Sequence, residues 1–211
     1  MRGPLHWDLT QPLRLSERTF HPDPIQQFRR WFRAAKRAGL PEPNAMTLAT
    51  TTRSGHPSAR MVLLKGIDER GFLFFTNYGS GKGRELEANP HAALVFYWRE
   101  VNRQVRVTGR VSKLPAVESD AYFATRPHGS QLAALASRQS SVIPSRAVLE
   151  ARYRKLETGY PNDGPPRPIN WGGYCVHPDE IEFWQQGPNR LHDRLRYRKS
   201  RGAWILERLS P

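Results

Sequence analysis

The spacing of apolar residues changes once along the chain, from a helical period near the N-terminus to a strand period beyond residue 45. Asp23 followed by Pro24 is typical of a helix start, because aspartate caps free backbone N–H groups and proline needs no donor at the first helical position. Gly39 marks the end of this segment. The helix between these points is predicted to bury one face, made up of Ile25, Phe28, Trp31, Phe32 and Ala35.

Beyond this helix, short β-rich runs are separated by turn residues. The alternation is clearest where Gln104 and Arg106 share one face of a run and Val105 and Val107 the other. The predicted strands cover residues 45–52, 58–67, 72–76, 92–98, 103–113, 172–177, 180–184, 191–198 and 203–209. Helices are predicted for residues 84–88, about 115–125 and about 145–157. Strands at this spacing predict a mostly β fold, an antiparallel barrel with peripheral α-helices.

The chain shows no internal repeat and no shift in composition that would mark a domain boundary. Its 211 residues are enough for one domain with a sizeable core. We therefore expect a single domain over residues 23–211. Residues 1–22 are rich in Arg and Pro and lack a sustained period, so we expect them to form an N-terminal arm that is extended or mobile.

The charge balance narrows the class of partner. Lys and Arg total 33 against 19 Asp and Glu, a formal net charge of +14. This favours an anionic partner, such as a phosphorylated small molecule, a nucleic acid or a membrane surface. The basic residues are spread from Arg2 to Arg208 without a dense block, which argues against a polybasic tail and, more weakly, against a nucleic-acid face.

Cysteine and histidine usage bears on metals and on the compartment. Cys175 is the only cysteine, which excludes an intrachain disulfide, fits a reducing compartment and predicts a small core residue. The seven histidines show no HxH or HExxH spacing, so no metal site is expected. No apolar run is long enough to span a bilayer and the N-terminus lacks the apolar stretch of a signal peptide, so we expect a cytoplasmic protein.

The stretch IEFWQQGPNRLHDR, which ends at Arg194, places an aromatic residue and a Gly-Pro turn ahead of three basic positions. If its last residues form a strand, Arg190, His192 and Arg194 point to one side, because alternate strand residues share a face. Leu191 then faces the core. Converging basic groups suit an anionic planar ligand, but a solvated basic edge strand has the same pattern, and this segment alone leaves both interpretations open.

Two further motifs point to phosphate. The run RMVLLK begins at Arg60 and ends at Lys65, and on a strand this odd spacing places the two cations on opposite faces, where each can hold an anion. The run TNYGSGKGRELEANP sets Lys82 at the expected start of a helix, where free N–H groups and a cation form a phosphate site. It is not a nucleotide P-loop, because Gly83 occupies the Ser/Thr position. Solvated strand ends and a plain Gly-rich turn are the alternatives.

A third group of polar residues lies between residues 120 and 145. Tyr122 and Arg126 are four apart and so lie on one helix face, and Ser130 follows after a short turn. These three can share a phosphate through charge-assisted hydrogen bonds. The run SRQSSVIPS offers Gln139 and Ser140 as polar ligands. A chance arrangement on a surface helix and a plain loop are the alternatives.

Taken in order, these motifs resemble the pyridoxine (pyridoxamine) 5′-phosphate oxidase family, whose members depend on FMN. The resemblance runs from about Asp23 to Pro211. Its most specific piece is EFWQ, a four-residue gap and then RLHDR, and the runs RMVLLK, TNYGSGK, RQVRVTG, SRQSS and WGGY follow in the family's order. The resemblance implies the FMN-binding split β-barrel fold and a homodimer with its two flavin sites at the subunit interface.

The same resemblance implies roles for individual residues. Arg190 and His192 are expected to be catalytic and to cover the pyridine ring of the substrate where it stacks on the flavin. The substrate phosphate is expected to be bound by Lys65, Tyr122, Arg126 and Ser130. FMN is expected to be bound, partly from the partner chain, by Arg60, Met61, Val62, Leu63, Leu64, Lys65, Phe75, Thr76, Lys82, Gln104, Gln139, Ser140, Trp184 and Arg194. Gly81 stands where relatives commonly have Arg beside the phosphate-binding Lys82.

The implied activity is oxidation of pyridoxamine 5′-phosphate or pyridoxine 5′-phosphate to pyridoxal 5′-phosphate, a step of vitamin B6 metabolism, with dioxygen as electron acceptor and hydrogen peroxide as product. A related flavin oxidase acting on another planar acid, such as a phenazine precursor, is a second hypothesis. The third is a non-catalytic flavin carrier or a basic nucleic-acid-binding barrel, which the high net charge motivates.

Overall fold

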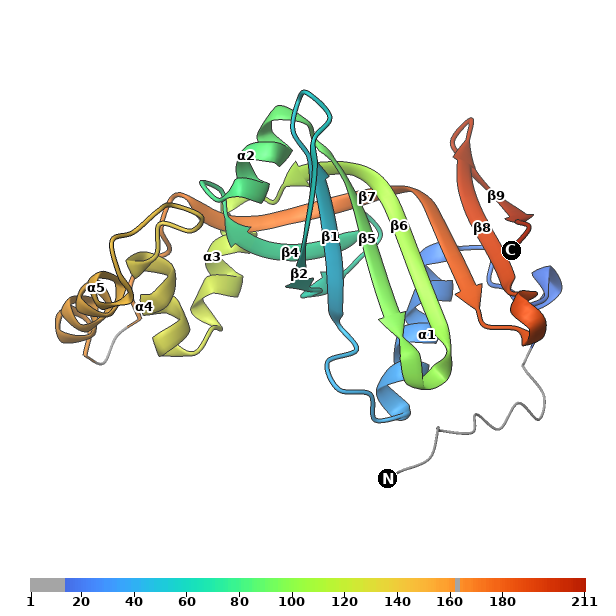
Figure 1. The fold of residues 1–211 in the computed structure, drawn as a ribbon, viewed down its shortest axis with the longest axis horizontal. Helices are drawn as coiled ribbons and strands as arrows, with labels where there is room; N and C mark the ends of the chain where they lie inside the picture. The colour runs from blue at the N-terminus through green and yellow to red at the C-terminus, as the bar shows by residue number, and fades with distance from the viewer. Residues whose placement is uncertain (1–13, 162–163) are drawn as a thin grey trace.

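The structure, a computed structural model, describes residues 14–161 and 164–211 (Figure 1). Nine antiparallel strands form one sheet that curls into a half-barrel. The strands are β1 (Ala45–Thr51), β2 (Pro57–Leu63), β3 (Gly66–Ile67), β4 (Phe72–Asn77), β5 (His91–Trp98), β6 (Arg103–Lys113), β7 (Trp171–Gln185), β8 (Asp193–Ser200) and β9 (Ala203–Arg208). The helices are α1 (Pro24–Arg37), α2 (Gly81–Ala88), α3 (Ala116–Ala124), α4 (His128–Ala136) and α5 (Arg146–Gly159). The mostly β fold predicted from the sequence is confirmed.

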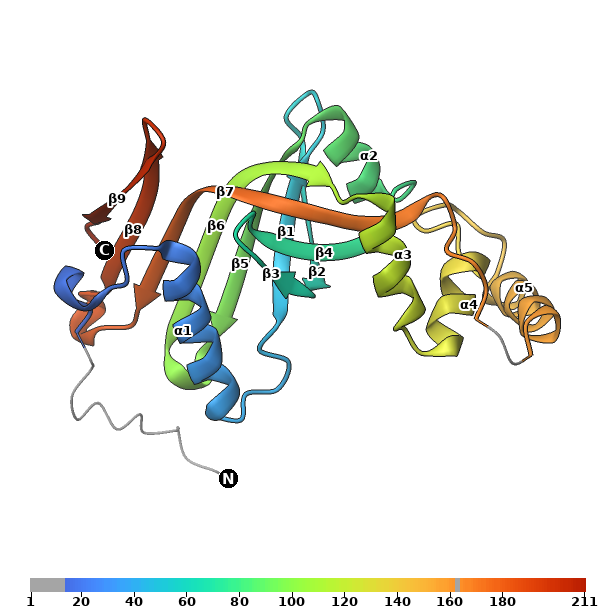
Figure 2. The same ribbon diagram turned by 180° about the vertical axis from the view of Figure 1, so that it is seen from behind.

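Helix α1 begins and packs as its sequence predicts. The Asp23 carboxylate accepts hydrogen bonds from the backbone N–H groups of Ile25 and Gln26, and proline occupies the first helical position. Phe28 is fully buried, with its ring centroid 4.9 Å from those of Phe72 and Phe96. This aromatic cluster fills the inside of the curled sheet, so α1 packs into the half-barrel and forms part of its core (Figure 2).

Strand β7 connects the two ends of the molecule. It pairs with β6 along most of its length, with β4 through its first half and with β8 through its second half. The register of β6 and β7 shifts between Thr108 and Gly109, where a Cβ on Gly109 would lie 1.9 Å from the carbonyl oxygen of His177. This irregularity falls where β7 stops pairing with β4 and begins to pair with β8. A β-bulge allows a strand to bend at such a point.

Helices α3 to α5 and the C-terminal hairpin, β8 and β9, lie at opposite ends of the sheet. Helices α3, α4 and α5 gather beyond the start of β7, whereas β8 and β9 continue from its far end (Figures 1 and 2). In the part of the chain that the structure describes, no helix is long and apolar enough to cross a membrane.

Residues 14–22, the described part of the expected N-terminal arm, pack against the C-terminal hairpin. The backbone N–H of Leu15 donates to Asp193, and Glu17 forms an ion pair with Arg208 at 2.8 Å. The ring of Phe20 lies 5.5 Å from that of Phe183. Residues 1–13 lie outside the described residues.

Most predicted strands are confirmed, and the differences have local causes. The run 58–67 is split, because the chain changes its partner there: β2 pairs with β1, whereas β3 pairs with β4. The two runs 172–177 and 180–184 form one strand, since Pro178 lies at the register shift and does not interrupt the pairing. Helix α4 was not predicted, although Gln131, Leu132 and Ala136 are buried at helical spacing on it.

Candidate active site

A cavity of about 690 Å³ opens between the end of β2, strand β4 and helices α3 and α4. Lys65, Tyr122, Arg126 and Ser130, the four residues expected to bind a substrate phosphate, all line it. The geometry differs from the prediction in one respect. Helix α3 ends at Ala124, so Arg126 lies just beyond the helix, and Ser130 lies in the first turn of α4. The short connection between the two helices brings the residues together all the same.

Aromatic rings build one wall of this cavity. The ring of Tyr122 stacks on that of Phe75 with centroids 3.9 Å apart and lies parallel to the ring of Trp171 at 6.2 Å. The Arg126 guanidinium lies 4.7 Å from the Trp171 ring centroid. Its buried Nη1 has no hydrogen-bond partner among the described residues, and burial lowers the pKa of this arginine. The wall therefore holds a partly desolvated cation that an anionic ligand can pair with.

The start of α2 forms the second cationic part of the site. Ser80 caps the helix by accepting a hydrogen bond from the backbone N–H of Gly83. Lys82 Nζ donates to Thr76 Oγ1 and to Gln139 Oε1, each at 3.3 Å. The helix begins at Gly81, three residues earlier than predicted. A helix N-terminus and a lysine thus face the loop that carries Gln139, and Ser140 Oγ lies 3.7 Å from the position of a Cβ on Gly81.

The environment of Lys82 penalises its charge. Burial lowers the pKa of Lys82, and the nearby Arg60 guanidinium lowers it further. Arg60 itself lies on the half-buried face of β2 and forms an ion pair with Glu85 of α2 at 3.2 Å. Arg60 and Lys82, which come from β2 and α2, therefore lie close enough to interact and offer an anion two positive charges.

The rest of RMVLLK divides between the site and the core. Leu63 and Lys65 line the cavity, whereas Leu64 is buried in the core. Met61 is exposed on the outer face of the sheet, and Val62 packs against the core cluster. The prediction that Lys65 lies on the strand face opposite Arg60 is wrong, because β2 ends at Leu63 and Lys65 follows it. Lys65 lines the cavity, whereas Arg60 pairs with Glu85.

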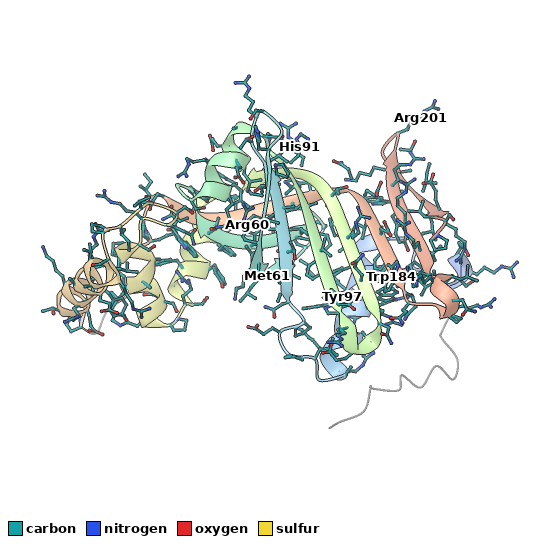
Figure 3. The ribbon with its side chains drawn as sticks, viewed as in Figure 1. Arg60, Met61, His91, Tyr97, Trp184 and Arg201 are labelled. Carbon is teal, nitrogen blue, oxygen red and sulfur yellow. The ribbon has the colours of Figure 1, made fainter. Side chains whose placement is uncertain are left out.

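A second group of expected site residues lies on the far part of the sheet. Gln104 of β6, Trp184 of β7 and Arg194 of β8 are direct neighbours in register. Arg194 forms an ion pair with the buried Glu182 carboxylate at 2.7 Å, and this hydrogen bond raises the pKa of Arg194. Figure 3 shows Trp184 on this part of the sheet, well away from Arg60 and Met61 on β2.

The prediction that Arg190, His192 and Arg194 share one strand face is wrong. Strand β8 begins at Asp193, and a 3₁₀ turn, Pro188–Arg190, precedes it. Arg190 has a positive φ of 62°, which removes it from an extended conformation. Leu191 is 69% exposed and does not face the core. The His192 ring instead lies 4.7 Å from that of Trp184.

The structure therefore separates the expected site into two groups within one chain. The cavity group surrounds the helical end of the sheet and contains Arg60, Lys65, Phe75, Thr76, Lys82, Tyr122, Arg126, Ser130, Gln139 and Ser140. The turn group lies at the other end of β7 and contains Gln104, Trp184, Arg190, His192 and Arg194. Among the residues of the two described segments, no cluster of His, Cys, Asp and Glu suited to a metal is found.

Three residues of these groups were not predicted from the sequence. Trp171 supports Arg126, Glu182 holds Arg194, and Glu85 pairs with Arg60. A signal was present for Glu85, because it lies three residues after Lys82 on one helix and so shares its face. The pairing of Glu182 depends on the register of β7 and β8, which the sequence does not reveal.

These features define a class of protein: a curled β-sheet with two basic, aromatic-lined groups suited to anionic planar ligands. Residues 32–159 match the family model described as pyridoxamine 5′-phosphate oxidase, and residues 171–211 match the model of a pyridoxine 5′-phosphate oxidase C-terminal dimerisation region. A pyridoxine/pyridoxamine 5′-phosphate oxidase of Burkholderia multivorans is 60% identical over 200 residues, with 93% of each chain covered. The chain belongs to the pyridoxamine 5′-phosphate oxidase family.

Solved structures agree with this fold. PhzG from Burkholderia lata, in complex with tetrahydrophenazine-1-carboxylic acid, superimposes with a TM-score of 0.86 at 35% identity, over 90% of this chain and 94% of PhzG. A pyridoxamine 5′-phosphate oxidase-related, FMN-binding protein from Nostoc punctiforme gives a TM-score of 0.72 at 17% identity, over 90% of this chain and 98% of that protein. The split-barrel fold expected from the sequence is confirmed, and the names of the relatives support an oxidoreductase.

Proposed function

We propose that this protein is an FMN-dependent oxidase that converts pyridoxamine 5′-phosphate or pyridoxine 5′-phosphate to pyridoxal 5′-phosphate. The observation that carries the proposal is the meeting of Lys65, Tyr122, Arg126 and Ser130 on one cavity. Two cations and two hydroxyl groups on a concave surface provide the charge-assisted hydrogen bonds that a phosphate monoester needs. The relatives of similar length carry the same activity in their names.

The cavity group also suits the cofactor. Lys82 and Arg60 offer two cations beside the N-terminus of α2, whose free N–H groups attract a phosphate. Thr76 and Gln139 supply polar contacts next to Lys82. These residues fit FMN in their donor chemistry, so we assign the flavin phosphate to this end of the cavity group and the substrate phosphate to the Arg126 end.

The turn group reaches this cavity only from a second chain. Gln104, Trp184 and Arg194 lie at the end of β7 opposite the cavity, and residues 171–211 match the family's dimerisation region. A homodimer in which the turn group of one chain covers the cavity group of the other would bring both groups together at each of two sites. This arrangement supports FMN binding between the chains.

When bound, FMN would supply the redox chemistry, a two-electron oxidation at C4′ of the substrate in which dioxygen is reduced to hydrogen peroxide; the amine substrate also consumes water and releases ammonia. The protein supplies position. Arg126 and Lys65 fix the substrate phosphate, and this binding orients C4′. Arg190 and His192 would cover the substrate ring from the second chain and hold it in place. Arg190 is exposed on the 3₁₀ turn that precedes β8, whereas the His192 ring packs against Trp184.

A phenazine-type oxidase is the second candidate, and the likeness to PhzG with its bound tetrahydrophenazine-1-carboxylic acid favours it. Such a ligand carries a carboxylate but no phosphate. The complete phosphate-binding set, with the unpartnered Nη1 of Arg126, favours the phosphorylated substrate. A phosphorylated substrate needs Arg126, Lys65 and Ser130 together to bind its phosphate. A phenazine-type substrate has no phosphate for these residues to bind.

One experiment tests the proposal. The purified protein is expected to be yellow, with the absorption bands of a flavin, and to produce both aldehyde and hydrogen peroxide when pyridoxamine 5′-phosphate is added in air. Pyridoxamine without phosphate is the matched control and is expected to react poorly. A yellow protein that forms neither product, or one that oxidises a dihydrophenazine carboxylic acid instead, contradicts the proposal. A colourless protein whose binding to duplex DNA falls steeply with salt would identify a nucleic-acid-binding barrel.

A further inference from the structure

The carboxylate of Glu85 lies beside Arg60 and Lys82, the two cations assigned to the flavin phosphate. Glu85 is on α2, three residues after Lys82, and its side chain is 17% exposed. Its Oε2 atom accepts hydrogen bonds from Thr50 Oγ1 and from Ser58 Oγ, the latter at 2.6 Å, and pairs with Arg60 Nη2 at 3.2 Å. This oxygen therefore receives three donors on the surface where a phosphate is expected.

The same network occupies the Arg60 guanidinium. Nη1 donates to the Leu48 carbonyl oxygen at 3.3 Å and to Thr50, while Nη2 donates to Ser58 and Glu85. The two hydroxyl groups thus accept from Arg60 and donate to Glu85. Protein groups therefore use both terminal nitrogens of Arg60, so a phosphate at this place would meet an arginine that already has an anionic partner.

The charge at this end is correspondingly low. Arg60 and Lys82 contribute two positive charges and Glu85 removes one, while Gly81 adds no side chain. Burial acts to raise the pKa of Glu85, but hydrogen bonds from Ser58, Thr50 and Arg60 outweigh burial and hold the pKa below its ordinary value. Glu85 is therefore an anion at neutral pH, and it repels a second anion bound nearby.

We infer that Glu85 competes with the cofactor phosphate for Arg60 and thereby sets the affinity of the protein for FMN. This carboxylate holds Arg60 in place through the ion pair at 3.2 Å. When FMN binds, its phosphate takes over part of Arg60 at the cost of the ion pair and of repulsion from Glu85. The inference rests on the proposed function, since it assigns the flavin phosphate to Arg60 and Lys82. It predicts that removing the charge of Glu85 tightens FMN binding.

The test compares FMN with riboflavin, which lacks the phosphate. Flavin-free protein is titrated with each, and quenching of flavin fluorescence gives the dissociation constants. Glu85→Gln keeps the size of the side chain and an oxygen that can accept from Ser58 and Thr50. It is expected to bind FMN roughly tenfold more tightly than the wild type, because one repulsive charge is lost, and to bind riboflavin as before. Glu87→Gln, the same change on the exposed face of α2, is expected to alter neither constant.

A second variant adds charge instead of removing it. Gly81 does not have a left-handed φ, and a Cβ there would meet only Ser140 Oγ, at an ordinary contact distance of 3.7 Å. Gly81→Lys is therefore expected to fold and to tighten FMN binding severalfold without affecting riboflavin. It tests whether charge at the start of α2 acts on the flavin phosphate, and unchanged FMN binding in this variant overturns the assignment of the phosphate to this place. If Glu85→Gln does not fold, Glu85→Ala, which also removes the charge, is measured instead. Unchanged or weaker FMN binding in the folded Glu85 variant, or an equal gain for riboflavin, overturns the inference. A wild-type protein that binds no FMN overturns the proposed function itself.

Discussion

Trp171 and Trp184 lie at opposite ends of one continuous strand, β7, and belong to different groups of the candidate site. Trp171 supports Arg126 in the cavity, whereas Trp184 packs against His192. At about 3.3 Å per residue, the strand between them runs on the order of 40 Å. The two groups therefore lie far apart along one chain, and the proposed reaction would require the turn group of a second chain.

Mixed dimers test this requirement directly. Arg126→Ala damages the cavity group and Arg190→Ala the turn group, so each homodimer is expected to be nearly inactive. A dimer with one chain of each kind has one site with both groups intact and one site with both damaged. An equal mixture is expected to recover about a quarter of wild-type activity, because about half of the dimers are mixed and each has one working site. Mixed dimers isolated with two affinity tags that stay inactive would contradict the two-chain site.

Arg126→Ala alone is expected to raise KM and lower kcat for pyridoxamine 5′-phosphate. The loss in kcat/KM is expected to be on the order of 100-fold, because a charge-assisted contact to phosphate is lost and the remaining binding no longer orients the ring. Steady-state kinetics with the unphosphorylated amine provide the comparison: there the variant is expected to match the wild type. Equal losses for both amines would mean that Arg126 supports the fold of the cavity and not the phosphate.

Arg190→Ala is expected to keep FMN and lose oxidation. Arg190 is exposed on the 3₁₀ turn and contributes to no core contact, so the protein should fold and remain yellow. The rate of flavin reduction under anaerobic conditions is expected to fall severely, since the substrate ring loses its cover. Arg201→Ala, at the exposed tip of the β8–β9 hairpin (Figure 3), removes the same charge and is expected to leave the rate unchanged. A near-normal rate for Arg190→Ala would remove this residue from the mechanism.

Local signals explain which elements could be predicted from the sequence. Helix α1 starts at Asp23 and Pro24, and strand β6 alternates cleanly, because cap and period are properties of neighbouring residues. Helix α4 was missed because its N-cap residue is Pro127, whose side chain cannot accept a capping hydrogen bond. The short turn before the helix also suggested a loop.

For the candidate site, too, the sequence reveals features of neighbouring residues but not contacts between distant segments. The resemblance identified residues such as Arg126 and Trp184, but their separation across β7 depends on strand pairing between distant segments. The turn at Arg190 escaped prediction, since a positive φ at a residue other than glycine leaves no mark in the sequence. Glu85 escaped because an acidic residue on an exposed helix is ordinarily solvated, and only packing of α2 against β1 and β2 makes it a partner of Arg60.

The stability of the half-barrel is expected to depend strongly on Phe28. This side chain is fully buried between α1 and the sheet, with close ring contacts to Phe72 and Phe96. Phe28→Ala is expected to lower the free energy of unfolding by about 3–5 kcal/mol, because a large cavity opens in the core. Phe32→Ala, on the same helix but only partly buried, is expected to cost clearly less. Urea denaturation of both variants at one protein concentration measures the difference, and equal losses would contradict the assigned centre of the core.

FMN affinity is expected to fall at alkaline pH earlier than an ordinary lysine would allow. Burial and Arg60 lower the pKa of Lys82 in the flavin-free protein, so Lys82 loses its charge below the usual lysine range. Binding of the FMN phosphate favours the charged form, and the dissociation constant therefore rises with pH once the free protein passes this lowered pKa. The sign for folding is opposite: the unfolded chain holds this proton more tightly, so stability rises with pH between the two pKa values.

Riboflavin and an arginine variant separate Lys82 from other groups. The flavin ring titrates alike in FMN and riboflavin, so the ratio of their dissociation constants isolates the phosphate. In the wild type this ratio is expected to change between neutral pH and about pH 10, near the reference pKa of lysine. In Lys82→Arg it is expected to stay constant over that range, because arginine keeps its charge. A wild-type ratio that is equally flat would show that Lys82 does not bind the phosphate through its charge.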